Sequence, residues 1–351
     1  MLTRYRPFCI VQRTDRSVSF ERIDMKQIGK AVAVYGAGGH TGRFVVDEAL
    51  SRGLTVVAIG RDASRLPAGV QGRVAAVDDA GALDEALKGC GVVINCAGPF
   101  LDTAAPVIEA ALRMRCGYID VAAEQASARA VFEDFDARAR AAGVAVIPAA
   151  GFYGGLADLL ASALAFGGPV SELGVAIALD HWWPTEGTRK TGERNQVPRV
   201  VLQDGQLVRM PTPAAQQAWV FGSGHGEQAV VELPFSEVIT IARHLDVKNL
   251  RSWLTLSSLQ EIRDTATPPP TASDAQGRSA QRFEMVVQAG DRKAIARGQD
   301  IYALSAPLVV EAAERMLQPS FKLSGALALG EAFEAKDFLQ SLKDVELQLP
   351  G

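Results

Sequence analysis

The chain has 351 residues, which exceeds what one hydrophobic core usually serves and favours two domains. A hydrophobic share of 48% and a net charge of −4 indicate a globular protein and argue against a nucleic-acid or membrane partner. Four cysteines without zinc-like spacing, and no apolar stretch of the ~20 residues that cross a bilayer, predict a cytoplasmic protein with no metal site.

The N-terminal segment has no clear hydrophobic period and lacks the apolar centre of a secretory signal. Residues 1–27 are predicted to be a flexible extension. Its first 24 residues precede Met25. We interpret them as a flexible extension or as the result of a translation start assigned too far upstream.

The stretch Lys30–Gly42 (KAVAVYGAGGHTG) is typical of the opening of a nucleotide-binding βαβ unit. Ala31–Val34 predicts a buried parallel strand, and the helical run Arg43–Arg52 follows the glycines directly. Three glycines have G-x-x-G-x-x-G spacing, which permits close approach to a pyrophosphate at a helix N-terminus, although an ordinary glycine turn is the alternative. The predicted phosphate-binding residues are Gly36, Gly38, Gly39, His40, Thr41 and Gly42.

The second strand, Leu54–Ile59, ends in Gly60-Arg61-Asp62. An acidic residue at this position usually binds the ribose of NAD, whereas the 2′-phosphate of NADP needs a cation and room. Gly60 leaves the room and Arg61 is the cation, so the sequence favours NADP(H). Two alternatives stay open: Arg61 as a surface arginine paired with Asp62, and NAD bound by Asp62.

Further strands and helices alternate up to residue 150, which predicts a Rossmann-type doubly wound parallel sheet over residues 28–150. The predicted strands are Val74–Asp78, Val92–Cys96, Tyr118–Val121 and Val144–Pro148, with helices at Ala80–Lys88, Ala104–Arg115 and Ala126–Ala142. Cofactor-binding positions at the carboxyl edge of this sheet are predicted at Asp78, Asn95, Ala97 and Gly98.

Residues 151–169 are predicted to be a connecting helix, and residues 170–298 an inserted α+β substrate or dimerisation domain. Its period-two segments predict a mainly antiparallel sheet. These segments are Leu173–Leu179, Val197–Val208, Ala229–Leu233, Val238–Ala242 and Arg282–Gln288. Residues 299–351 begin with a strongly amphipathic helix, Tyr302–Leu317, and continue with a second one, Ala332–Leu342. We predict that this tail returns to the Rossmann domain.

Candidate substrate-binding groups gather in two places. Gly187, Thr188 and Arg189 lie at a predicted helix start and would hold an anion, unless they form only a capped helix with surface charges. Tyr153 at the domain junction, His181 beside the anion site and Lys190 are the predicted catalytic residues.

Several motifs together resemble the saccharopine dehydrogenase-like NAD(P)-binding oxidoreductase family over about residues 28–342. They are VYGAGGHTGRFVV, GRD, VINCAGPF, GYIDVAAE, GGLADLLA, a GT-containing linker and DIYALSAPLVVEAAERML. The resemblance implies a Rossmann domain with an inserted domain, and reductase activity on diverse substrates. Short-chain dehydrogenases are excluded because no tyrosine has a lysine four residues later.

The sequence thus predicts an NADPH-dependent reductase that transfers hydride to a C=N or C=C bond of a small, anionic metabolite at the interdomain cleft. A homodimer is expected because of strands at the edges of the second sheet. The alternative is a non-enzymatic NADP-binding redox sensor or scaffold protein, since no unmistakable acid–base pair is present.

Overall fold

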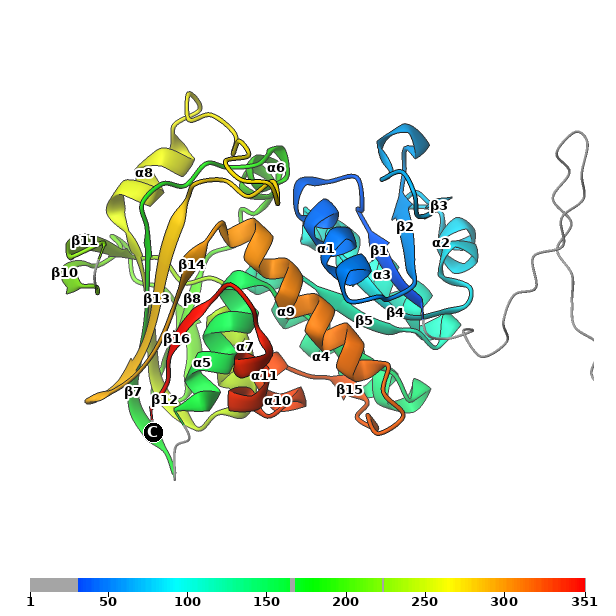
Figure 1. Cartoon of the computed structure of the whole chain (residues 1–351). Coiled ribbons are helices and arrows are strands. Elements are labelled where there is room, and N and C mark those ends of the chain that lie inside the picture. Colours follow the sequence, from blue (N-terminus) through cyan, green and yellow to red (C-terminus); the bar gives the residue numbers. More distant parts are fainter. Residues whose placement is uncertain (1–30, 165–167, 223, 351) are drawn as a thin grey trace, which may run out of the picture.

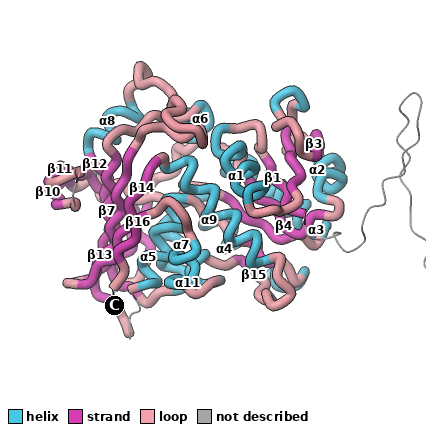
Figure 2. The backbone as a smooth tube through the Cα atoms, viewed as in Figure 1, coloured by secondary structure: helices cyan, strands magenta, loops and turns pink. Residues whose placement is uncertain are grey.

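The computed structural model describes residues 31–164, 168–222 and 224–350, and the predicted extension at residues 1–27 lies outside them. Figure 1 shows two lobes, each built on one β-sheet, with a long helix running diagonally between them. Figure 2 shows the strands of the two sheets and the helices that lie between and around them. The predicted fold class is confirmed: one sheet is parallel and flanked by helices, and the other is mostly antiparallel.

The parallel sheet has seven strands in the order β15-β6-β5-β4-β1-β2-β3. The strands are β1 Ala31–Tyr35, β2 Val56–Gly60, β3 Gln71–Val74, β4 Cys90–Asn95, β5 Gly117–Asp120, β6 Ala145–Ile147 and β15 Gly325–Ala326. Its helices are α1 His40–Ser51, the short η1 Ala63–Arg65, α2 Ala80–Leu87, α3 Phe100–Met114, α4 Gln125–Ala142 and α9 Ile301–Met316.

Side chains of β1 alternate between two apolar layers, as expected for a strand with helices on both faces. Val32 and Val34 pack in the layer that contains α1 and α9. Ala33 and Tyr35 pack in the layer that contains α2 and α3. The predicted buried parallel strand therefore forms at the centre of the sheet.

The second sheet has nine strands, seven of them in the order β10-β11-β12-β7-β13-β14-β16, with the β8–β9 hairpin beside β12. Only the β7–β12 pair is parallel. The strands are β7 Val170–Leu179, β8 Val200–Gln203, β9 Gln206–Arg209, β10 Gln216–Val220, β11 Glu227–Glu232, β12 Val247–Thr255, β13 Arg282–Ala289, β14 Arg292–Gln299 and β16 Glu346–Gln348. The accompanying helices are the π-turn η2 Phe152–Leu156, α5 Ala157–Ala163, α6 Glu186–Arg194, α7 Glu237–His244, α8 Leu256–Arg263, α10 Leu329–Ala332 and α11 Ala335–Ser341.

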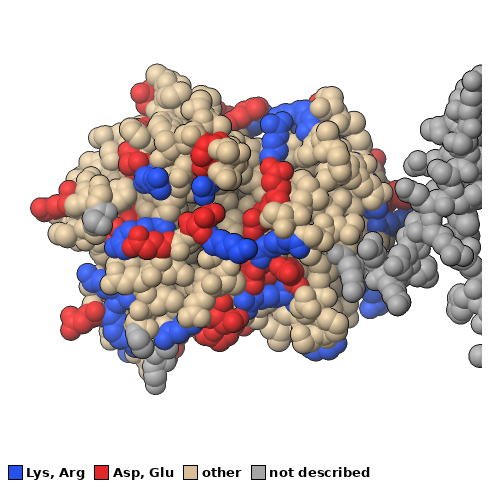
Figure 3. All heavy atoms as spheres, in the orientation of Figure 1, with Lys and Arg blue, Asp and Glu red and all other residues tan. Residues whose placement is uncertain are grey.

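The C-terminal tail contacts both lobes. Helix α9 lies along α1, and Arg52, which caps the end of α1, forms ion pairs with Glu311 and Glu314 of α9. Strand β15 then extends the parallel sheet beside β6, as the predicted return implies. The last strand, β16, instead pairs with β14 of the second sheet. On the face shown in Figure 3, acidic and basic side chains mingle and neither sign covers it alone.

Three predicted strands differ in the structure. Val238–Ala242 forms part of helix α7, because its side chains find buried neighbours around a helix packed on α4, α5 and η2. Val197–Val208 is a hairpin rather than one strand, because the chain reverses at Asp204 and Gly205, which both have positive φ. The strand predicted at Val74–Asp78 ends at Val74, where pairing with β2 stops.

Strand β12 was not predicted, although it lies in the middle of the second sheet. Polar residues interrupt its apolar pattern, and one of them, Arg251, is paired across the sheet with buried Glu232 at 2.7 Å. In the part of the chain that the structure describes, no helix is both long and apolar enough to cross a membrane.

Candidate cofactor and substrate site

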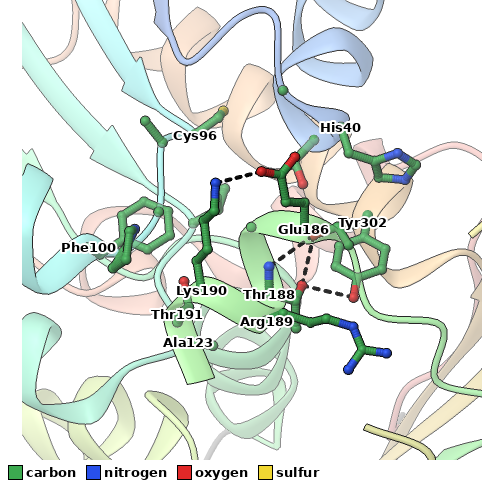
Figure 4. A pocket seen from close by; sticks show the side chains of 18 of the residues that line it. His40, Cys96, Phe100, Ala123, Glu186, Thr188, Arg189, Lys190, Thr191 and Tyr302 are labelled. Atoms are coloured by element: carbon green, nitrogen blue, oxygen red, sulfur yellow. Dashed lines mark hydrogen bonds and ion pairs between the residues drawn. The ribbon is translucent and has the colours of Figure 1, made fainter. Parts of the chain in front are cut away.

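A cavity of about 1180 Å³ lies where the carboxyl ends of the parallel strands face the second lobe. Open α/β sheets bind their ligands at this edge. The glycine turn and the turn after β4 line one part of the cavity, and η2, α6, α8 and the start of α9 line the other. Figure 4 shows this region, with Cys96 and Phe100 from the first lobe opposite Thr188 and Lys190 of α6.

The glycine turn has the geometry that a pyrophosphate requires. Gly36 has φ +83°, and a Cβ atom there would lie 2.9 Å from the backbone nitrogen of Ala97. No side chain caps helix α1 at Gly39, so its first N–H groups are available to phosphate oxygens. The cavity is lined by the predicted residues Gly36, Gly38, Gly39, His40 and Thr41. Gly42 lies behind them, where a Cβ atom would collide with the Gly36 carbonyl oxygen at 2.1 Å.

Two arginines line the cavity beyond β2. Arg61 was predicted there, whereas Arg65 was not, because it comes from the next turn, η1. Asp62 caps η1 by accepting hydrogen bonds from the backbone nitrogen and hydroxyl of Ser64, at 2.9 and 2.7 Å. These bonds lower the pKa of the Asp62 carboxyl, so it is ionised and already partly engaged. The acidic residue after β2 therefore acts locally as a helix cap.

The turn after β4 is ordered by Asn95, which is buried. Its carbonyl oxygen accepts the Ala97 N–H at 3.0 Å, and its amide nitrogen donates to Thr103 and Tyr118. Of these predicted cofactor-binding residues, Ala97 and Gly98 line the cavity, whereas Asn95 supports them from behind. Asp78 is not among the lining residues, because β3 ends earlier than predicted and Val77 reaches the cavity instead.

The thiol of Cys96 and the carboxyl of Glu124 lie at the same edge of the sheet. Burial raises the pKa of the Cys96 thiol well above its usual value, so the thiol stays neutral. Glu124 accepts the backbone N–H groups of Phe100 and Ala123 at 3.0 and 3.1 Å. Burial raises the pKa of Glu124 to about 7, even though these hydrogen bonds favour its charged form. Glu124 is thus a cavity carboxyl that titrates near neutral pH.

Thr188 and Arg189, two of the predicted anion-binding residues at the start of helix α6, already take part in hydrogen bonds within the protein. Thr185 accepts the Thr188 N–H at 3.0 Å, so part of the helix N-terminus is already capped. Gly187 and Thr188 line the cavity, and the Thr188 hydroxyl lies 3.0 Å from that of Tyr302. The Arg189 guanidinium also lines the cavity, but it donates to the backbone oxygen of Thr267 at 2.7 Å. Its charge is therefore only partly available to a ligand.

Among the predicted catalytic residues, Lys190 and Tyr153 line the cavity. Lys190 lies 2.5 Å from Glu186 in an exposed ion pair, which Figure 4 shows. His181 is not a lining residue: its ring stacks on Trp183, and its Nδ1 atom lies 2.8 Å from a Glu261 oxygen at the surface. The strand–helix connection that carries His181 turns its side chain toward α8 rather than toward the cofactor edge.

His40 is enclosed by two aromatic rings, Phe44 and Tyr302, which meet it edge-on at 5.3 and 5.4 Å between ring centroids. Burial lowers the pKa of His40, so its ring is neutral near pH 7. Its buried Nε2 atom has no hydrogen-bond partner. A polar atom left unpaired at the phosphate turn fits a site that receives a polar ligand.

The part of the cavity on the side of the second lobe is lined by the aromatic residues Phe152, Tyr153, Trp182 and Phe235, and we call it the aromatic chamber. The Tyr153 ring stacks on Phe235 with centroids 4.1 Å apart, and its buried hydroxyl has no hydrogen-bond partner. Burial raises the pKa of Tyr153 well above 10, so the hydroxyl keeps its proton. Arg199 and Arg263 also line this chamber, and neither was predicted from the sequence. In the described ranges, no group of three or more His, Cys, Asp or Glu residues could hold a metal ion.

Comparison with known proteins identifies the nucleotide-binding part. Residues 32–147 match the family described as the saccharopine dehydrogenase NADP-binding domain, and no curated protein matches the chain. Among solved structures, apo saccharopine dehydrogenase (L-Glu forming) from Saccharomyces cerevisiae is similar over 92% of this chain and 100% of its own. The TM-score is 0.63 and the identity is 13%.

A shorter similarity links the chain to Citrobacter sp. triphenylmethane reductase complexed with NADP(H). It has 23% identity over 26% of this chain and 37% of that one, with a TM-score of 0.25. The domain match confirms the resemblance noted from the motifs over residues 32–147, and the yeast structure shows that the similarity of fold extends over most of the chain. Residues 32–147 thus form a saccharopine dehydrogenase NADP-binding domain, and the chain as a whole has a fold similar to that of the yeast structure.

Proposed function

We propose that the protein is an NADPH-dependent reductase that transfers hydride to a C=N or C=C bond of a small, anionic metabolite. The observation that carries this proposal is the single cavity that joins the glycine turn to the aromatic chamber around Tyr153. Cofactor and substrate can therefore meet in one shared cavity, which catalysis requires and cofactor sensing alone does not.

The residues on the cofactor side fit NADPH. The free N–H groups at the start of α1 would bind the pyrophosphate, and Arg61 with Arg65 would bind the 2′-phosphate. Bound NADPH supplies the hydride. Residues Ala97 and Gly98 would lie against the nicotinamide ribose, because they follow a central strand at its carboxyl end.

On the substrate side, Tyr153 is the better supported of the predicted catalytic groups. Its protonated, unpaired hydroxyl can donate a hydrogen bond to the substrate. Lys190 can contribute positive charge if its pair with Glu186 opens. The surface position of His181 supports no role in the chemistry.

The proposal includes a cytoplasmic homodimer. Three free cysteines among the described residues, Cys90, Cys96 and Cys116, support a reducing compartment. Sedimentation of the purified chain would test the dimer.

Turnover is tested by following the absorbance of NADPH with three panels: imines formed from 2-oxo acids and amines, enoates, and simple carbonyl compounds. We expect oxidation with a member of the first or second panel, and loss of kcat in Tyr153→Phe. Binding of NADPH without turnover in any panel would refute the reductase. A change of oligomeric state between NADP⁺ and NADPH in such a protein would instead favour the sensor or scaffold.

A further inference from the structure

Arg199, which lies just before β8, brings a positive charge into the cavity without an ion-pair partner. Its guanidinium donates to the Pro234 carbonyl oxygen and lies 4.8 Å from the centroid of the Phe235 ring. Among the described residues, no carboxylate oxygen lies within 4.0 Å of this guanidinium. Burial lowers the pKa of Arg199, but an arginine keeps its charge in proteins. A partly buried cation without an ion-pair partner is costly, which points to an anionic ligand.

The other charged groups near Arg199 do not neutralise it. Glu237 is fully buried, accepts the Phe235 N–H at 2.9 Å, and has its pKa raised by burial, which disfavours its anion. Glu124 also attracts Arg199, but both of its oxygens hold backbone N–H groups. Arg263 of α8 lines the same chamber and repels Arg199. The chamber therefore has an excess of positive charge.

A neutral hydrogen-bond donor lies beside these arginines. Tyr153 packs on Phe235, as Arg199 does, and its buried hydroxyl has no partner. An arginine and a tyrosine hydroxyl are suitable donors for a carboxylate. Apart from Arg263, the walls around these two donors are largely apolar, which suits the hydrocarbon body of a ligand. Its apolar walls are Phe152, Trp182, Leu233, Phe235, Leu259 and Ile262.

We propose that Arg199 anchors the carboxylate of the substrate, with Tyr153 donating a hydrogen bond beside it, and that the substrate is a carboxylate with an apolar body. The inference that this ligand is a substrate rests on the proposed reductase activity. Binding of a carboxylate by Arg199 does not depend on turnover. A substrate with several charged groups would leave some of them against apolar walls, which is unfavourable.

The test uses the full chain saturated with NADP⁺ and measures binding without turnover. The probes are 3-phenylpropanoate and 3-phenylpropanamide, which differ only in the charged group. Calorimetry should show at least tenfold tighter binding of the carboxylate, because an Arg–carboxylate pair is worth about one order of magnitude or more. Equal affinities, or binding of neither probe, would overturn the proposal.

Substitutions locate the anchor. Arg199→Gln should abolish the preference for the carboxylate, whereas Arg209→Gln should retain it, because exposed Arg209 on β9 lies opposite Val200 and does not line the cavity. Tyr153→Phe should weaken carboxylate binding, and its effect should not add to that of Arg199→Gln if both contact one anion. A preference that survives Arg199→Gln would refute the assignment.

Stability separates a ligand-binding role from a structural one. Because Arg199 has no ion pair to lose, Arg199→Met should leave the Tm unchanged or raised while carboxylate binding disappears. A large fall in Tm together with intact carboxylate binding would mean that Arg199 is structural. If the carboxylate binds but NADPH is not oxidised with any panel, the assignment of Arg199 as the carboxylate-binding residue is supported and the proposed reductase activity is refuted.

Discussion

A Cβ atom placed on Gly36 would lie 2.9 Å from the backbone nitrogen of Ala97, so the turns after β1 and β4 touch each other at the centre of the sheet edge. The two turns belong to neighbouring strands, β1 and β4, which are paired in parallel. The contact fixes the phosphate turn relative to the turn proposed to carry the nicotinamide ribose. Any side chain at residue 36 would push the two apart.

Replacing Gly36 with alanine should therefore weaken NADPH binding by at least tenfold. The change also adds left-handed backbone strain, which costs about 1–2 kcal/mol. Gly53→Ala is a matched control, because Gly53 has φ +73° and a Cβ atom added to it would have no neighbour within 4 Å. Gly36→Ala should lose more thermal stability, because only its Cβ atom meets the Ala97 backbone, and only Gly36→Ala should lose affinity in a fluorescence titration. Equal affinities in the two variants would contradict the proposed phosphate turn.

Arg61 and Arg65 should together set the preference for NADPH over NADH. Replacing either with glutamine should raise the Kd of NADPH about tenfold and change that of NADH little, since only NADPH carries the 2′-phosphate. Arg61→Asp should have the larger effect because it adds a repelling charge. Arg129→Gln, on the exposed surface of α4, is the control. Equal losses for the two cofactors would show that these arginines do not contact the 2′-phosphate.

The parallel sheet could be predicted from the sequence because its signals are local. The apolar strand, the glycine spacing and the following helix are contiguous in Lys30–Arg52, and the structure has them as β1, the turn and α1. The cofactor residues follow from the same local pattern. The bounds of β3, and with them the position of Asp78 relative to the cavity, were harder to predict, because this edge strand has mostly exposed side chains and gives a weak pattern.

The substrate side depends on contacts between distant residues. Arg199 belongs to a polar stretch with no local motif, and only folding brings it to Phe235 and the aromatic chamber. Helix α7 was read as a strand because a short apolar run fits both periods, and tertiary packing decides between them. His181 was chosen for its place in the sequence next to α6, yet its side chain turns to Glu261.

Glu124 should make cofactor preference depend on pH. Its pKa of about 7 means that the carboxyl is mostly neutral at pH 6 and mostly charged at pH 8. A negative charge at the cavity wall favours the positively charged nicotinamide of NADP⁺ over neutral NADPH. The ratio of the two affinities should therefore shift toward NADP⁺ as the pH rises through about 7, measured by titration at several pH values. Glu124→Gln should flatten this shift, and an unchanged profile in that variant would exclude Glu124 as its cause.

The buried pair His244–Asp158 should make folding stability depend on pH. The His244 Nε2 atom lies 2.6 Å from an oxygen of fully buried Asp158, whose other oxygen accepts the Gly330 N–H at 2.7 Å. Burial alone would lower the pKa of His244, but attraction to Asp158 outweighs it and raises the pKa. The pair links α5 and α7, and the same carboxylate holds the start of α10.

Because the pKa of His244 is higher in the folded than in the unfolded protein, protonation favours folding. Its stabilisation is fully present below the unfolded value of about 6.5 and is lost as the pH rises through the folded value. Urea unfolding at pH 6 and pH 9 should therefore show a larger penalty for His244→Gln at pH 6. His225→Gln, outside this cluster, should show no such difference. A penalty for His244→Gln that is equal at both pH values would mean that the pair stabilises the fold without a change in protonation.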